Sequence, residues 1–60
     1  MNGADLIKLL KSHGFAVIGA RDSHHKLRNA VNITVIVPHP KKDLGKSLVA
    51  AILKQAGIRP

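Results

Sequence analysis

Apolar residues recur along the chain with two different periods, and each period predicts a different kind of element. Leu6, Ile7 and Leu10 fall on one face at the spacing of an α-helix. Asn2 suits the N-cap position ahead of them, and Gly14 can adopt the left-handed backbone conformation that ends a helix. The pattern therefore predicts a first helix between Asn2 and Gly14.

Three stretches with the character of β-strands follow the first helix. Residues 15–20 (FAVIGA) are apolar, residues 24–28 (HHKLR) alternate, and residues 33–37 (ITVIV) form the clearest strand. Residues 21–23 and 29–32 supply the two intervening turns. Because four residues of the third strand are apolar, we expect it in the middle of the sheet or between two layers.

A second helix is predicted near the C-terminus. Ser47 suits its N-cap position and Gly57 its C-terminal stop. The prolines that follow the third strand separate it from this helix, since proline cannot continue a strand ladder. The apolar side of the helix consists of Leu48, Val49, Ile52, Leu53 and Ala56.

The predicted order of elements is α-β-β-β-α. Short connections favour a three-stranded antiparallel meander, and a two-layer α+β sandwich with both helices on one face is the simplest way to bury the apolar sides. The chain of 60 residues makes one domain, 1–60, which buries only roughly 60% of the surface of its unfolded form. Without cysteine, stability must come from apolar packing, a partner or self-association.

The charged residues of the chain indicate that it binds another molecule. The chain carries ten Lys and Arg residues against three Asp and Glu, a formal net charge of +7. This charge indicates a polyanionic partner, either a nucleic acid or an acidic protein. The chain has neither the pattern of a signal peptide nor an apolar stretch approaching the ~20 residues of a membrane span. We therefore expect a cytoplasmic protein that does not enter a membrane.

The segment DSHHKLR places two adjacent histidines in the second predicted strand. Because successive strand side chains point to opposite faces, His24 shares a face with Lys26 and Arg28. His25 shares the other face with Leu27, which needs burial. His24 is thereby assigned to the open face, where the two cations could neutralise the charge of a phosphate that meets the imidazole.

Other roles for the histidines are less favoured. Metal binding by His24, His25 and His39 lacks support because adjacent strand residues diverge and no carboxylate or thiolate cluster completes a ligand set, so we expect no metal and no cofactor. Ser23 lacks the oriented base and acid that a serine nucleophile needs. His13, at a helix end, and His39, between prolines, fit structural roles.

Three segments, DLIKLLKSHGF, SHHKL and VIVPHPKKDLGKSLVAAILKQAGI, resemble in this order the HicA family of mRNA interferase toxins, small basic partners of HicB antitoxins. The resemblance extends from Asp5 to Ile58. It implies a fold similar to a double-stranded-RNA-binding domain, which agrees with the predicted order of elements. It also implies a metal-independent endoribonuclease that cleaves mRNA and is neutralised by a HicB-like antitoxin.

The resemblance places the family's catalytic histidine at His24, the residue that strand alternation also assigns to the open face. Two positions depart from the family pattern: Asp22 stands where glycine is common, and Phe15 stands where tryptophan is usual. The residues expected to contact RNA are Ser23, Lys26, Arg28, Lys41 and Lys42.

Two other functions stay open at this point. A non-catalytic RNA-binding module of the same fold is favoured by the negative charge of Asp22 beside the expected phosphate site. The scarcity of aromatic residues points the same way, because Phe15 is the single one and is expected in the core. A third hypothesis is a protein whose main role is interaction, either as a component of an antitoxin-bound complex or as a remnant toxin.

Overall fold

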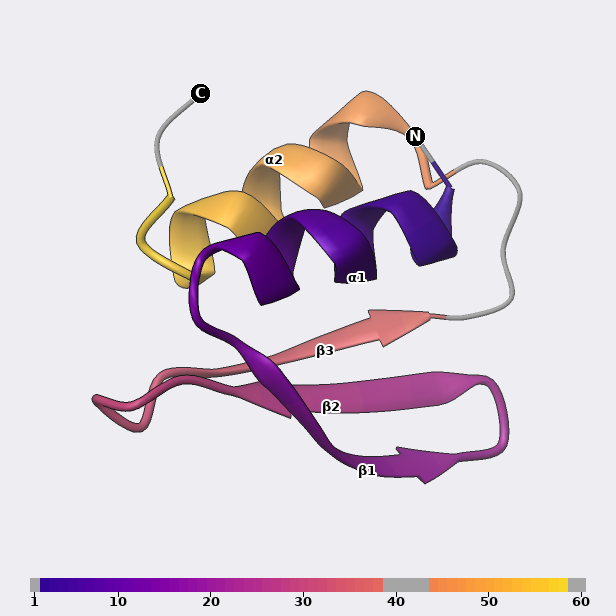
Figure 1. Cartoon of the computed structure of the whole chain (residues 1–60). Helices are drawn as coiled ribbons and strands as arrows, with labels where there is room; N and C mark the ends of the chain where they lie inside the picture. The colour runs from indigo at the N-terminus through magenta and orange to yellow at the C-terminus, as the bar shows by residue number, and fades with distance from the viewer. Residues whose placement is uncertain (1, 39–43, 59–60) are drawn as a thin grey trace.

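The computed structural model of the chain describes residues 2–38 and 44–58. Its elements are α1 (Gly3–Ser12), β1 (Ala16–Arg21), β2 (His24–Arg28), β3 (Thr34–Pro38) and α2 (Lys46–Gln55). Both helices lie over the same face of the antiparallel sheet (Figure 1). The structure thus confirms the α+β class, the α-β-β-β-α order and the placement of the two helices on one face.

Helix α1 begins and ends where the sequence predicts. The Asn2 side chain accepts a hydrogen bond of 2.8 Å from the backbone N–H of Asp5, which satisfies a donor of the first turn. Gly14 follows the helix with a φ of 89°, a conformation that a residue with a Cβ atom rarely adopts. Leu6, Ile7 and Leu10 are buried as expected.

The strand order in the sheet is β1-β2-β3, so the meander is confirmed and β2 lies in the middle. The expectation that residues 33–37 form the middle strand or lie between two layers is wrong. β3 is an edge strand, because two successive hairpins leave the third strand outermost. The helices cover only one of its faces, and Ile36 on the other face is 50% exposed.

Helix α2 begins earlier than predicted. The N-cap residue is Gly45, with a φ of 74°, and Ser47 lies inside the helix instead of capping it. The chain turns into the helix at the glycine, which supplies the backbone conformation but no capping side chain. The end of the helix agrees with the prediction, since Gly57 has a φ of 76°.

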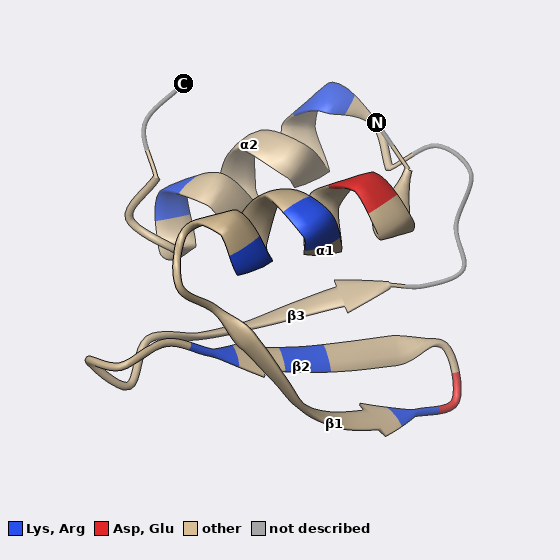
Figure 2. Cartoon of the chain, viewed as in Figure 1, with Lys and Arg blue, Asp and Glu red and all other residues tan. Residues whose placement is uncertain are grey.

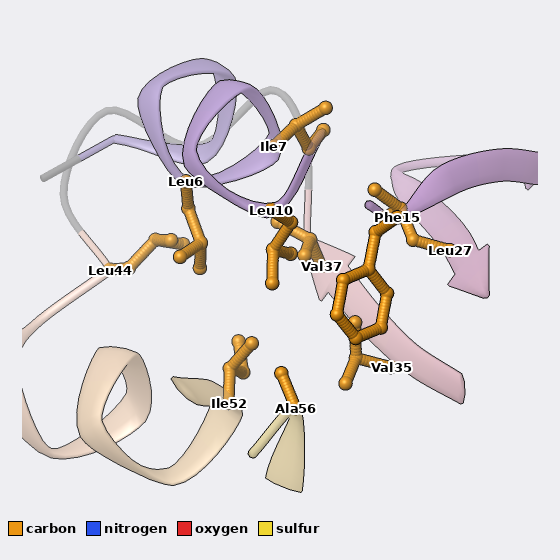
Figure 3. Packing of buried hydrophobic residues seen from close by; sticks show 10 residues of the cluster. All are labelled: Leu6, Ile7, Leu10, Phe15, Leu27, Val35, Val37, Leu44, Ile52 and Ala56. Atoms are coloured by element: carbon orange, nitrogen blue, oxygen red, sulfur yellow. The ribbon is translucent and has the colours of Figure 1, made fainter. Parts of the chain in front are cut away.

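The hydrophobic core lies between the helices and the inner face of the sheet (Figure 3). The core differs from the predicted one at two residues. Leu48 is exposed, and Leu44, which the pattern had not included, is buried just before α2. β1 contributes no buried side chain, although Phe15 immediately before it is buried. The fully buried large side chains are Leu6, Leu10, Leu27, Val35 and Val37.

Replacing Leu27 should destabilise the whole fold, because its side chain is fully buried in the middle strand. We expect Leu27→Ala to lower the free energy of unfolding by about 2–5 kcal/mol. Ile36→Ala, on the exposed face of the adjacent strand, should cost no more than about 1 kcal/mol. Urea unfolding followed by circular dichroism measures both, and equal losses for the two variants would contradict this account of the core.

Candidate functional site

The face of the sheet opposite the helices presents a row of basic side chains. His24, Lys26 and Arg28 are exposed and alternate along β2 with His25 and Leu27. The two groups therefore point to opposite faces, as the sequence predicts. His25 is half-buried and Leu27 is buried, which identifies their face as the one that the helices cover.

Arg21 adds a fourth group to this row. It ends β1 and is paired with His24 across the hairpin, so the two side chains share a face. We call Arg21, His24, Lys26 and Arg28 the basic row; Figure 2 shows its Lys and Arg members along β2 and at the end of β1. Sequence reasoning missed Arg21, because residues 21–23 were all assigned to the turn.

The shortness of the turn was the feature that could have identified Arg21. Only Asp22 and Ser23 separate β1 from β2. In a two-residue hairpin, the residues that flank the turn lie directly opposite each other. An arginine immediately before such a turn is therefore held beside the first residue of the next strand, which here is His24.

The neighbours of the basic row on β3 also position it. Arg28 is paired with Thr34, and its Nε donates a hydrogen bond of 3.0 Å to the Thr34 hydroxyl oxygen. This bond holds one end of the guanidinium group on the open face and leaves its other nitrogens available to a ligand. Lys26 lies between Gly19 and Ile36, and its side chain is exposed.

The turn before His24 has an unusual backbone. Asp22 has a φ of 55°, whereas Ser23 is not among the residues with positive φ. The φ of Asp22 lies in the left-handed region, which glycine adopts freely and which aspartate tolerates better than most residues. Asp22 occupies this conformation with a charged side chain, where glycine would meet no steric cost.

Of the other residues singled out in the sequence, some lie in the described part of the chain and some do not. Ser23 is exposed in the turn, next to His24. His13 is exposed at the C-cap of α1, away from the basic row. Lys41, Lys42 and His39 lie outside the described residues.

Positive charge is not confined to the sheet. Four further lysines lie on the helices (Figure 2): Lys8, Lys11, Lys46 and Lys54. They are exposed and belong to the layer on the other side of the core from the basic row. The basic row differs from them in that three cations and an exposed imidazole lie on one face of two paired strands.

Two further tests concern metals and membranes. Within residues 2–38 and 44–58, no three His, Cys, Asp or Glu side chains gather in a way that could hold a metal ion. Neither described helix has the length and apolar character needed to cross a bilayer.

The fold and site define a small basic α+β protein that presents a histidine among cations on an open sheet face. A family model described as the HicA toxin of bacterial toxin-antitoxin matches residues 3–58, which include both helices and all three strands. The chain therefore belongs to the HicA family of toxins of toxin–antitoxin systems, and the resemblance inferred from the sequence is confirmed. A search of curated proteins found no match.

The backbone at Asp22 leads to a test by substitution. Asp22→Gly should raise the free energy of unfolding by up to about 1 kcal/mol, because glycine has no Cβ atom to strain a positive φ. Asp22→Val should lower it by about 1–3 kcal/mol, because a β-branched residue is strongly disfavoured there. Thermal or urea unfolding measures both. The same stability for the glycine and valine variants would show that the turn does not impose this φ.

Proposed function

We propose that this toxin is a metal-independent endoribonuclease that cleaves mRNA in the cytoplasm and that a HicB-like antitoxin neutralises it. The observation that carries the proposal is the position of His24, exposed at the start of β2 and beside Arg21, with Lys26 and Arg28 along the same face. An RNA backbone that follows the basic row would bring its phosphates to the cations and one scissile phosphate to the imidazole.

The chemistry requires a proton transfer and stabilisation of negative charge. His24 would act as the general base on the 2′-hydroxyl or as the general acid on the leaving oxygen, a contribution worth ~10²–10⁴-fold in rate. Arg21 and Lys26 would stabilise the charge that develops on the phosphoryl oxygens. Attack by the 2′-hydroxyl is our hypothesis for the nucleophile, since it restricts cleavage to RNA and needs no metal-bound water.

Recognition would rest on the backbone of the RNA. The single aromatic residue of the chain, Phe15, is buried in the core and cannot stack on a base. Ser23 lies next to His24 and can donate or accept a hydrogen bond at a phosphate. Lys41 and Lys42 are included in the proposed RNA-binding set from the sequence, beside Lys26 and Arg28.

His24 and His25 should fail in different ways when replaced by alanine. His24→Ala removes an exposed group, so we expect a folded protein that still binds RNA but has lost cleavage and toxicity. His25→Ala opens a gap beside Leu27 and should lower the free energy of unfolding by about 1–3 kcal/mol. Circular dichroism and a gel assay of RNA cleavage on the purified variants separate the two effects.

The same assay distinguishes this proposal from the non-catalytic alternative. Cleavage by the wild-type protein should persist in EDTA. If His24→Ala cleaves like the wild type, or if cleavage requires an added divalent metal, His24 is not a metal-independent catalyst. Salt-dependent RNA binding with no cleavage by the wild-type protein would favour an RNA-binding module.

The basic row should also determine the salt dependence of RNA binding. Lys26→Ala and Arg28→Ala should each lower the slope of log affinity against log salt by about one unit at most, because each removes one phosphate contact. Lys54→Ala is the matched control, since it removes an equal charge from α2 on the other layer. Fluorescence anisotropy with a labelled single-stranded RNA measures the slopes; equal reductions for Lys26→Ala and Lys54→Ala would contradict binding on the sheet.

A further inference from the structure

β1 is the most exposed element of the sheet. All six of its residues are exposed. The helices cover the inner face of the sheet near the β3 edge, away from the β1 edge (Figure 1). Its inner edge is paired with β2, and no described strand pairs with its outer edge. A free edge presents unpaired N–H and C=O groups, to which another strand can bind.

The sequence of β1, AVIGAR, does little to prevent such pairing. Lysine and proline, which block many natural edges, are absent from it, and Arg21 at its end is the one charged residue. Val17 and Ile18 are large apolar side chains that remain exposed, Ile18 to 48%. The register shift between Val17 and Gly19 bends the first half of the strand, so the second half offers the more regular edge.

From this edge we infer that β1 binds an extended segment of an acidic protein as a fourth strand, with carboxylates of that segment on the open face. The identification of this protein as the antitoxin rests on the proposed function. The proposal goes further in naming the element that is recognised, the backbone pairing, and the chemistry of the partner strand.

Gly19 is the feature that favours an acidic partner. It is paired with Lys26, and a Cβ atom built on Gly19 meets nothing within 4 Å. Neighbouring strands lie about 4.8 Å apart, so a residue of an added strand opposite Gly19 would be about 10 Å from the backbone of Lys26. With no side chain between them, a glutamate or aspartate at that position could meet the lysine ammonium group.

Arg21 sets the spacing of a second carboxylate. It lies two residues after Gly19, so both residues belong to the open face. A partner strand with acidic residues at alternate positions would therefore place one carboxylate against Lys26 and another against Arg21. Because Arg21 is paired with His24, a carboxylate that binds the Arg21 guanidinium group would take that cation away from an RNA phosphate at the imidazole.

A second copy of this chain fits the edge less well. Pairing of two β1 strands about a twofold axis perpendicular to the sheet would place both basic rows on the same face of the joined sheet. Each chain carries a formal charge of +7, so this arrangement brings like charges together. An acidic strand replaces this repulsion by attraction.

The backbone of Ala20 provides the sharpest test. In a two-residue hairpin the flanking pair, Arg21 and His24, exchanges hydrogen bonds, so the N–H of Ala20 points to the outer edge. Ala20→Pro removes this donor without removing a bond to β2. Ala20→Val is the matched control, because it enlarges the side chain but keeps the N–H and suits a strand.

The experiment uses the whole toxin chain and a HicB-like antitoxin, each purified separately. We expect Ala20→Pro to bind the antitoxin about tenfold or more weakly than Ala20→Val, the effect of leaving a partner carbonyl unpaired. Gly19→Val should also weaken the complex, because its side chain fills the space that the carboxylate requires. In the wild-type complex, hydrogen exchange of the Ala20 amide should be slower than in the free toxin.

Several results would overturn the inference. Equal antitoxin affinity of Ala20→Pro and Ala20→Val would do so, as would unchanged exchange of the Ala20 amide in the wild-type complex, a measurement that stands even if Ala20→Pro does not fold. A free toxin that sediments as a dimer and becomes monomeric in Ala20→Pro would assign the edge to a second copy. RNA cleavage is measured separately: a toxin without cleavage whose β1 is protected by the antitoxin would refute the proposed function and keep this inference.

Discussion

The packing of Leu6 and Leu10 of α1 against Leu27, Val35 and Val37 of the sheet holds the two layers together. These are the largest fully buried side chains of the chain's described part, and no disulfide supports them, since the chain has no cysteine. A domain of this size has only about 3–9 kcal/mol of total stability, so each of these contacts is a substantial share of it. The contacts use one face of the sheet and leave the other free.

That free face is what makes a functional site possible in so small a protein. Because strand side chains alternate, the burial of Leu27 requires its neighbours Lys26 and Arg28 to point away from the core. The hairpin register then brings Arg21 beside His24. The same alternation that builds the core therefore collects the cations and the imidazole that we propose to act on RNA.

The exposure of the edge strand β1 also follows from the small size of the protein. Two short helices cover the inner face above β3 but do not bury any residue of β1, so its backbone edge and the side chains of Val17 and Ile18 stay exposed. A partner that covers this edge would bury apolar surface and reach the basic row at once. Inhibition and stabilisation of the toxin could then arise from one contact, in keeping with a toxin–antitoxin system.

Local patterns in the sequence determined much of this protein. The helical period of Leu6, Ile7 and Leu10, the cap at Asn2 and the alternation around Leu27 predicted the order of elements and the open-face position of His24. These features depend on residues close together in the chain, whose preferences act before any long-range contact forms. Whether His24 is catalytic stays a prediction, as does the role of Lys41 and Lys42.

The tertiary structure decided between two conflicting predictions for the central strand, residues 24–28 from the meander and residues 33–37 from apolar content. It also decided where α2 begins and which cation lies beside His24. The apolar stretch 33–37 predicted a central strand, yet β3 is an edge, because strand position depends on which hairpins close and not on apolar content. The N-cap residue of α2 is Gly45 and not the predicted Ser47, because the path of the chain into α2 set the start of the helix. Arg21 joined the site through its register with β2, which the two-residue turn sets and which the predicted three-residue turn, 21–23, had missed.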